Sequence, residues 1–342
     1  MMNNRPITKA EPLQRIPEWA ADSLAWRSFA FYSANMRYLM PNVPVAFHAA
    51  SFEETQLLRA ENADSLLAAR RLGEMPAPLS WRGGVPFPAI VATFHTGPYP
   101  LVCGWLMQHR IPFALLLSAD VLQRQELRYR QLYRQITGVA PDEKSFVCID
   151  ASDPRSLFRM RTVFNQGMVL VAYLDGNTGV PLPRGTAPRL VLDFMGRPMA
   201  AKVGVAFIAH LTGVPVYPLA CYRAGNGVRW LEGAKVEAAK GEVREAYVKR
   251  CMATSYGVLE ALLLARAPQW EGWLYVHHDL LLDPPSQTKL PTGLQPEAIN
   301  EFMPFQIREH YFVLHTPTFA TYRIPRRLHD ELKRHADIFF CI

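Results

Sequence analysis

The chain has 342 residues, a hydrophobic fraction of 49% and a formal net charge of +7. This length allows one large domain or two, and the absence of any run of about 18 uncharged apolar residues predicts no transmembrane helix. A basic surface suits nucleic acid, an anionic membrane or an acidic protein, but no helix-turn-helix, zinc-finger or RNP motif occurs, which argues against nucleic acid. Scattered cysteines without a C-x-x-C pair, and an N-terminus without the apolar core of a signal peptide, predict a cytoplasmic protein with free thiols.

Residues 1–84 read as an N-terminal helical region. An aromatic, amphipathic segment over 24–40 is followed by a polar helix over 51–73. The proline-rich stretch MPAPLSWRGGVPFP then separates this region from the rest of the chain. Together with the basic charge, segment 24–40 makes a peripheral contact with the inner face of a membrane an alternative to a wholly cytoplasmic location.

Residues 85–284 alternate between predicted strands and helices. The strands are AIVATF, FALLLS, FVCI, MVLVAYL, RLVLDFM, VPVYPLACY and WLYV, the last over 273–276. The helices are predicted around 101–109, 121–137, 154–166, 200–212 and 243–266. This alternation predicts an α/β fold with a mixed, largely parallel central sheet flanked by helices.

Residues 285–342 read as a linker and a small C-terminal extension. After the linker, HYFVLHT and TFATYRI form a predicted strand pair, and PRRLHDELKRHA forms a helix. The extension has the size of a small peptide-recognition module.

The stretch AIVATFHTGPYPLVCGWL, residues 89–106, is the most informative part of the sequence. His95 ends an apolar strand, and Gly97 and Pro100 break the chain before a helix. A side chain at such a strand-to-helix turn lies beyond the carboxyl end of the sheet, where reactive groups of α/β folds gather. His95 is therefore a structural histidine or a general base, and the backbone N–H groups of Thr96 and Gly97 are candidates for an oxyanion hole.

Three blocks downstream of His95 complete a pattern. MVLVAYLDGNTGVPLPRG, residues 168–185, is a strand that opens into Asp175 and Gly179. Residues 190–219 read as a strand, a Phe-Met-Gly-Arg-Pro turn, a helix of small residues, a Thr-Gly break and a strand. APQWEGWLYVHHDL, residues 267–280, places two tryptophans before a strand and a His-His-Asp.

The order of these blocks resembles the lysophospholipid acyltransferase superfamily, most closely its lipid A late-acyltransferase branch, the lauroyl and myristoyl acyltransferases. The resemblance covers about residues 85–282 and is most specific in 190–219 and in the closing Trp-His block. It implies a glycerolipid acyltransferase-like fold and transfer of an acyl group from an acyl carrier protein or coenzyme A thioester to a hydroxyl or amine. It also implies that His95 is the general base, that no covalent acyl-enzyme forms, and that the protein binds no metal or other cofactor.

The chain departs from the family at the acid of the histidine motif. The family has Asp or Glu five residues after the histidine, where this chain has Pro100. We predict that Asp175 orients His95 instead, because both residues end strands of one sheet, although turn chemistry alone also explains an aspartate at this place. Asp193 ranks lower because it is on the wrong side of its strand. Other candidates, which follow another strand and could bind a polar acceptor, are Asp150, Asp153 and Arg155.

Further residues are candidates for binding the donor or the acceptor. They are Arg124, Arg128, Arg197, Gly179 and Trp273. Arg124 and Arg128 share the predicted helix 121–137 with two more arginines, which form either a solvated helix face or a surface for an acidic carrier protein. His277 and His278 are neighbours on a predicted strand and point to opposite faces, so we expect no metal site there.

Three functions remain open. The first is an acyltransferase acting on a lipid, a specialised metabolite or a peptide; the absence of the family's membrane anchor favours an acceptor outside lipopolysaccharide assembly. The second, motivated by Pro100, is a non-catalytic relative that binds an acyl chain or a carrier protein. The third is altered thioester chemistry, condensation or hydrolysis, which an accessible Cys103 beside the site would favour.

Overall fold

The computed structural model describes residues 17–63, 76–78, 81, 87–176, 189–225, 227–282 and 301–338. Its contacts group into two compact units. Unit 1 comprises Met1–Gln56, Asp193–Met199 and Ala265–Ile342, and unit 2 comprises Leu57–Leu192 and Ala200–Leu264. The sequence predicts three consecutive regions, 1–84, 85–284 and 285–342, whereas the two units are interleaved along the chain.

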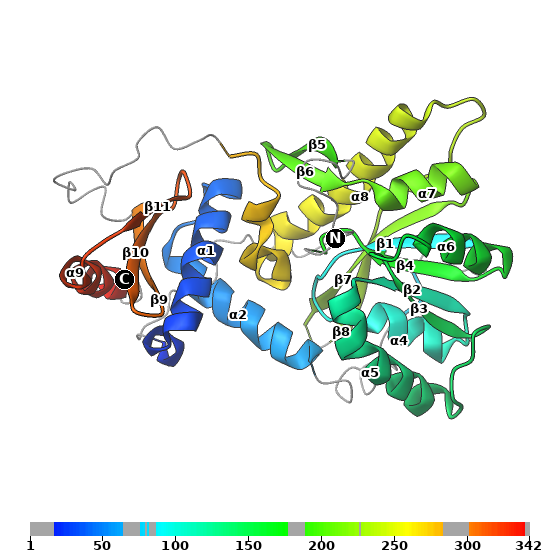
Figure 1. The fold of residues 1–342 in the computed structure, drawn as a ribbon, viewed down its shortest axis with the longest axis horizontal. Helices are drawn as coiled ribbons and strands as arrows, with labels where there is room; N and C mark the ends of the chain where they lie inside the picture. The colour runs from blue at the N-terminus through cyan, green and yellow to red at the C-terminus, as the bar shows by residue number, and fades with distance from the viewer. Residues whose placement is uncertain are drawn as a thin grey trace. The chain divides into compact units, whose positions relative to one another are not determined.

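Unit 2 is built on a six-stranded sheet in the order β3-β2-β4-β1-β7-β8 (Figure 1). All neighbouring strands pair in parallel except β7 and β8. The central strand β1 is buried along its whole length, as expected for a parallel strand covered on both faces. The predicted α/β fold with a mixed, largely parallel sheet is therefore confirmed. The strands are β1 (Ala89–Thr93), β2 (Phe113–Leu117), β3 (Phe146–Asp150), β4 (Val169–Tyr173), β7 (Val216–Ala224) and β8 (Gly227–Glu232).

Helices cover both faces of this sheet. In Figure 1, α4 and α5 lie on one face, and α6 and α7 lie on the other. On the first face, Val91 and Val171 of the sheet pack in one buried cluster with Leu106 of α4 and Tyr133 of α5. The loops at the strand ends are therefore where unit 2 can carry polar, reactive side chains. The helices are α4 (Leu101–Gln108), α5 (Ala119–Thr137), α6 (Ser156–Asn165), α7 (Gly204–Thr212) and α8 (Arg244–Arg266).

The chain connections that follow the neighbouring strands β1 and β4 run in opposite directions across the sheet. β1 is followed by α4 and by β2, which lies on the far side of β4. β4 is followed by a hairpin, α7 and β7, which lies on the far side of β1. In α/β sheets, ligands bind at such a reversal, beyond the carboxyl ends of the two strands. The residues that follow Thr93 and Tyr173 are placed at this edge.

The hairpin before α7 consists of β5 (Arg189–Phe194) and β6 (Arg197–Lys202). Its turn residues Met195 and Gly196 have φ values of 53° and 77°. Two positive φ values in a two-residue loop are typical of a type I′ turn, which folds the chain back along β5. The predicted helix over 200–212 is therefore wrong at its start, because residues 200–202 belong to β6.

Unit 1 combines helices with an antiparallel sheet in the order β11-β10-β9. Asp22 caps the first long helix, because its carboxylate accepts hydrogen bonds from the backbone N–H groups of Leu24 and Ala25. The predicted C-terminal strand pair and helix are confirmed, and the sheet has a third strand, β9, that the sequence analysis does not predict. The elements are η2 (Glu18–Ala21), α1 (Ser23–Leu39), α2 (Ala46–Asn62), β9 (Phe302–Ile307), β10 (His310–His315), β11 (Ala320–Arg323) and α9 (Arg326–Ile338). Of α2, residues 46–56 belong to unit 1 and residues 57–62 to unit 2.

The predicted strand over 273–276 is wrong. Two short 3-10 helices, η6 (Glu271–Leu274) and η7 (Val276–His278), replace it, with Tyr275 as the turn between them; they follow η5 (Ala267–Gln269). The Trp270 ring packs so closely on Gly272 that a Cβ there would lie 2.1 Å from it. The buried rings of Trp270 and Trp273 meet edge to face, 5.1 Å apart. Tryptophan packing therefore overrides the β propensity of the segment.

His48 of α2 should make the stability of the protein depend on pH. Its ring is fully buried, and its Nδ1 lies 2.8 Å from the Ser33 hydroxyl. Burial, together with the charge of Arg37, lowers the pKa of His48 to about 3. Below about pH 6.5 the unfolded chain binds a proton that the folded protein excludes. His48 by itself should therefore lower the free energy of unfolding by about 1.4 kcal/mol per pH unit from about pH 6.5 towards pH 3.

Urea titrations at several pH values measure this slope. A His48→Gln variant keeps a polar group that can bond to Ser33 but cannot titrate, so its slope should be shallower by about one proton. His277, whose pKa is lowered by burial to about 4, contributes to the slope of both proteins. Equal slopes for the two proteins would contradict the prediction.

Candidate active site

β1 and β4 bring His95 and Asp175 together. The two strands pair with Thr93 opposite Tyr173, so each of the two side chains lies two residues beyond the last pair. His95 Nδ1 lies 2.9 Å from Asp175 Oδ1. The His95 backbone N–H donates to the same carboxylate, at 3.2 and 3.0 Å from its two oxygens. The contact predicted from the sequence is confirmed, and these residues are called the His–Asp pair below.

Two tyrosines fix the plane of the His95 ring. Tyr173 stacks on it, with ring centroids 4.5 Å apart and 26° between the planes. Tyr99 meets it edge to face, with centroids 4.7 Å apart. The Tyr173 hydroxyl donates to the Tyr99 carbonyl oxygen at 3.1 Å, and burial raises the pKa of Tyr173 well above its usual value. Sequence reasoning missed Tyr173, although strand alternation places it on the same face as the residue two positions later, Asp175.

The two side chains of the His–Asp pair differ in their exposure to solvent. The side chain of Asp175 is 4% exposed, whereas that of His95 is 24% exposed. A buried carboxylate needs hydrogen bonds in place of water, and the backbone and ring of His95 supply them. When Nδ1 carries the proton that faces the carboxylate, Nε2 carries the basic lone pair of the ring. The pair therefore has the arrangement of a general base with its orienting acid.

The turn after His95 is tight. The Thr96 backbone N–H donates to the Phe94 carbonyl at 2.8 Å. Gly97 has a φ of 51°, in the left-handed region that favours glycine. Because the Thr96 N–H is engaged within the turn, it is not available as an oxyanion donor in this geometry. Pro100 immediately precedes α4, so the position five residues after His95 carries no hydrogen-bonding side chain.

The predicted arginines of α5 have different environments. Arg124 is exposed. Arg128, in contrast, donates to the Asn62 carbonyl at 2.8 Å, and Arg130 forms an ion pair with Glu126. Arg128 is therefore part of the packing of unit 2 rather than of a solvated helix face.

Three other predicted binding residues lie elsewhere in the chain. Arg197 and Trp273 belong to unit 1, whereas the His–Asp pair belongs to unit 2. In unit 1 the Arg197 guanidinium lies 4.7 Å from the centroid of the Tyr38 ring, and Trp273 is fully buried. Gly179 lies outside the described residues.

The other candidate aspartates have local partners. Asp150 Oδ1 accepts hydrogen bonds from the backbone N–H and the hydroxyl of Ser152. Asp153 Oδ1 accepts one from the Arg155 backbone N–H. Asp193 is exposed on β5. Local turn geometry accounts for the carboxylates of Asp150 and Asp153.

Cys103 does not offer an accessible nucleophile. It is fully buried in α4, and burial raises the pKa of its thiol far above the usual value. Within the described parts of the chain, no three His, Cys, Asp or Glu side chains gather as metal ligands would. In the same parts, no helix combines the length and the apolar content needed to cross a bilayer.

No protein-family model matches the chain, and no curated protein matches it. An imidazole backed by a buried carboxylate lies at the carboxyl edge of a parallel sheet, where the chain connections reverse. Such a pair can accept a proton from a hydroxyl, an amine or water and return it to a leaving group.

Proposed function

We propose that the protein is an acyltransferase that moves an acyl group from an acyl carrier protein or coenzyme A thioester to a hydroxyl or amine of a lipid, metabolite or peptide. His95 is the general base and Asp175 its orienting acid. The observation that carries this proposal is the 2.9 Å contact between His95 Nδ1 and Asp175 Oδ1. The resemblance of residues 85–282 to the lipid A late acyltransferases supports acyl transfer among the reactions that such a pair can catalyse. The acid comes from the end of β4 rather than from the turn after His95.

The reaction proceeds without an acyl-enzyme. His95 Nε2 accepts the proton of the acceptor O–H or N–H while the acceptor atom bonds to the thioester carbonyl carbon. The carbonyl π electrons move to oxygen and give a tetrahedral intermediate. When it collapses, the C–S bond breaks, the ester or amide stays on the acceptor, and the imidazolium returns its proton to the thiolate. Asp175 stabilises the imidazolium and stays ionised throughout.

Release of free thiol from acyl thioesters tests this proposal. The purified protein is incubated with acyl carrier protein and coenzyme A thioesters of several chain lengths, with and without a panel of alcohols and amines. We expect thiol release that depends on an acceptor. Intact mass spectra of the enzyme itself should show no attached acyl group. Release without an acceptor would identify a hydrolase instead. No release by the folded protein from any donor would contradict the proposal and favour a non-catalytic binding protein.

Donor binding should depend on charge at α5. Arg124 and Arg134 are exposed on this helix, and Leu127, which is 68% exposed, lies between them. Because acyl carrier proteins are acidic, we expect the double variant Arg124→Glu/Arg134→Glu to bind the carrier protein about 10-fold more weakly at low salt. High salt should reduce the difference, since it shortens the Debye length. Calorimetric titration with acyl carrier protein measures both effects.

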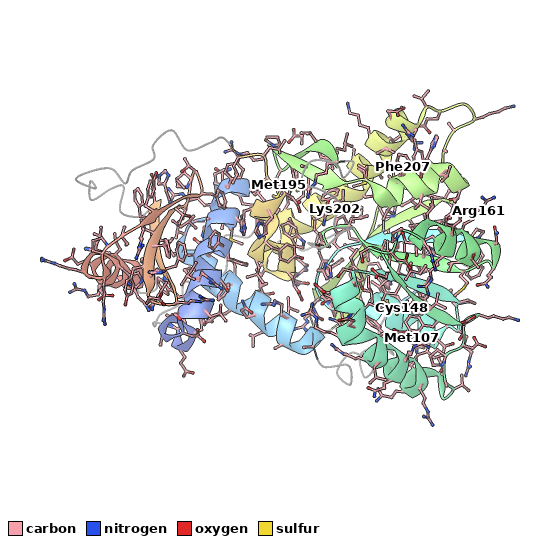
Figure 2. The ribbon with its side chains drawn as sticks, in the orientation of Figure 1. Met107, Cys148, Arg161, Met195, Lys202 and Phe207 are labelled. Carbon is pink, nitrogen blue, oxygen red and sulfur yellow. The ribbon has the colours of Figure 1, made fainter. Side chains whose placement is uncertain are left out.

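Arg161→Glu is a charge-reversal control on another helix and is compared with the single variant Arg124→Glu, which changes the net charge by the same amount. Arg161 is exposed on α6, on the other face of the sheet from α5 (Figure 2). Arg161→Glu should therefore bind the carrier protein as the wild type does. Weakening by Arg161→Glu equal to that by Arg124→Glu, or unchanged binding by the α5 double variant, would contradict a specific role for α5.

A further inference from the structure

Two side chains from outside the sheet hold the turns of the His–Asp pair. Asn62, the last residue of α2, donates from Nδ2 to the Gly97 carbonyl at 2.9 Å. Lys202, the last residue of β6, donates from Nζ to the Gly176 carbonyl at 2.7 Å. Gly97 follows the histidine by two residues, and Gly176 directly follows the aspartate. Each turn is therefore anchored through a backbone carbonyl next to the reactive side chain.

The C-terminal turn of α2 is itself held in place. Asn62 is 7% exposed. Its own carbonyl accepts the hydrogen bond from Arg128 of α5, and a basic group at a helix C-terminus also complements the helix dipole. The preceding residue, Glu61, forms an ion pair with Arg223 of β7. The Asn62 amide is thus fixed against the Gly97 carbonyl by contacts from two other elements of unit 2.

The turn of Asp175 is anchored on both sides of the aspartate. Lys202 holds the carbonyl of the residue after it. The Tyr256 hydroxyl of α8 donates to the carbonyl of the residue before it, Leu174, at 3.3 Å. Asp175 therefore sits between two carbonyls whose positions are set by side chains from β6 and α8.

We propose that Asn62 and Lys202 are positioning residues that fix the two turns so that the ring of His95 meets the carboxylate of Asp175. This inference rests on the proposed function. The last backbone hydrogen bond between β1 and β4 runs from the Leu174 N–H to the Thr93 carbonyl at 2.8 Å, so the ladder between these strands does not reach the carbonyls of Gly97 and Gly176. Backbone carbonyls past the end of a ladder need donors from elsewhere, and Asn62 and Lys202 supply them.

Variants that remove each donor with little change of volume test this role. In Asn62→Leu and Lys202→Met we expect the kcat of acyl transfer to fall about 10- to 100-fold, because a displacement of about 1 Å in a catalytic group has effects of this size. The KM for the donor should change little. Lys202→Arg keeps a cationic donor and should retain most of the activity of the wild type.

Nitrogen NMR of the His95 ring gives a second readout that needs no substrate. In the wild type we expect a single tautomer with the proton on Nδ1, and in Asn62→Leu and Lys202→Met a mixture of tautomers. Arg110→Met is the matched control. It removes a hydrogen bond of the same kind, from Arg110 to the Thr137 carbonyl at 2.9 Å, and should leave both readouts unchanged.

The two readouts separate failure of this inference from failure of the proposed function. If His95→Ala leaves thiol release unchanged, the proposed function is wrong, and the tautomer measurement still tests the positioning. If His95→Ala abolishes release but folded Asn62→Leu and Lys202→Met keep the wild-type kcat and a single tautomer, the positioning inference is wrong. A fall in kcat with an unchanged tautomer also contradicts it, because the two donors would then act by another route.

Discussion

Replacing Asp175 with Asn is expected to lower the kcat of acyl transfer by about 100- to 10,000-fold while the protein stays folded. Asn has the shape of Asp but no charge, so it cannot stabilise the imidazolium that forms when His95 takes the acceptor's proton. Its amide nitrogen can also face Nδ1 and favour the wrong tautomer. Water does not compensate, because the side chain of Asp175 is 4% exposed. The loss should appear in kcat rather than in the KM for the donor.

Steady-state thiol release in the presence of an acceptor measures this effect. Asp142→Asn is the control, since it removes the charge of another aspartate whose side chain accepts a local hydrogen bond, from the Lys144 backbone N–H. It should behave as the wild type does. A folded Asp175→Asn protein with the wild-type kcat would show that His95 needs no carboxylate, and the role proposed for Asp175 would be wrong.

Replacing His95 with Ala should lower turnover by about 100-fold or more, because no group then accepts the acceptor's proton. His95→Gln, which keeps a polar side chain between Tyr99 and Tyr173, should be impaired to a similar extent. Adding Asp175→Asn to His95→Ala should change little, since an orienting acid has no effect without its base. Circular dichroism and thermal melting establish that each variant is folded.

His109 provides a matched control for the histidine. Its ring also stacks on an aromatic ring, that of Trp105, at 4.0 Å between centroids. Its Nδ1 lies 2.9 Å from the Trp105 carbonyl oxygen rather than from a carboxylate. His109→Gln should therefore keep the wild-type turnover. If His95→Ala and His109→Gln had the same effect, the loss would reflect altered packing rather than removal of a base.

The His–Asp pair could be predicted because both residues end apolar runs. Parallel strands deliver their carboxyl ends to one edge of a sheet, so strand ends alone indicated that His95 and Asp175 share an edge. Their direct contact depends on more than this. It requires β1 and β4 to be neighbours with Thr93 opposite Tyr173, and that order and register follow from the packing of the whole sheet.

The two residues that hold the turns of the His–Asp pair, Asn62 and Lys202, could not be predicted from the sequence. Asn62 ends a polar helix, and Lys202 follows small residues whose composition predicts a helix rather than β6. Both contacts join segments far apart in the sequence, so only the folded chain reveals them.

The strand predicted over 273–276 is wrong for a similar reason. The Trp270 ring packs against Phe194, and the Trp273 carbonyl accepts a hydrogen bond from Asn35. Local β propensity contains neither of these contacts.

Mass spectrometry of the reaction products tests the proposed transfer most directly. Acyl carrier protein and coenzyme A, each bearing an isotope-labelled acyl thioester, are mixed separately with a panel of alcohols and amines and with either the wild-type or the His95→Ala protein. We predict that the wild type moves the label to a hydroxyl or amine, and that His95→Ala does so about 100-fold more slowly. Label that stays on both donors with the folded wild type, or that reaches the acceptor equally fast with His95→Ala, would contradict catalysis of acyl transfer by His95.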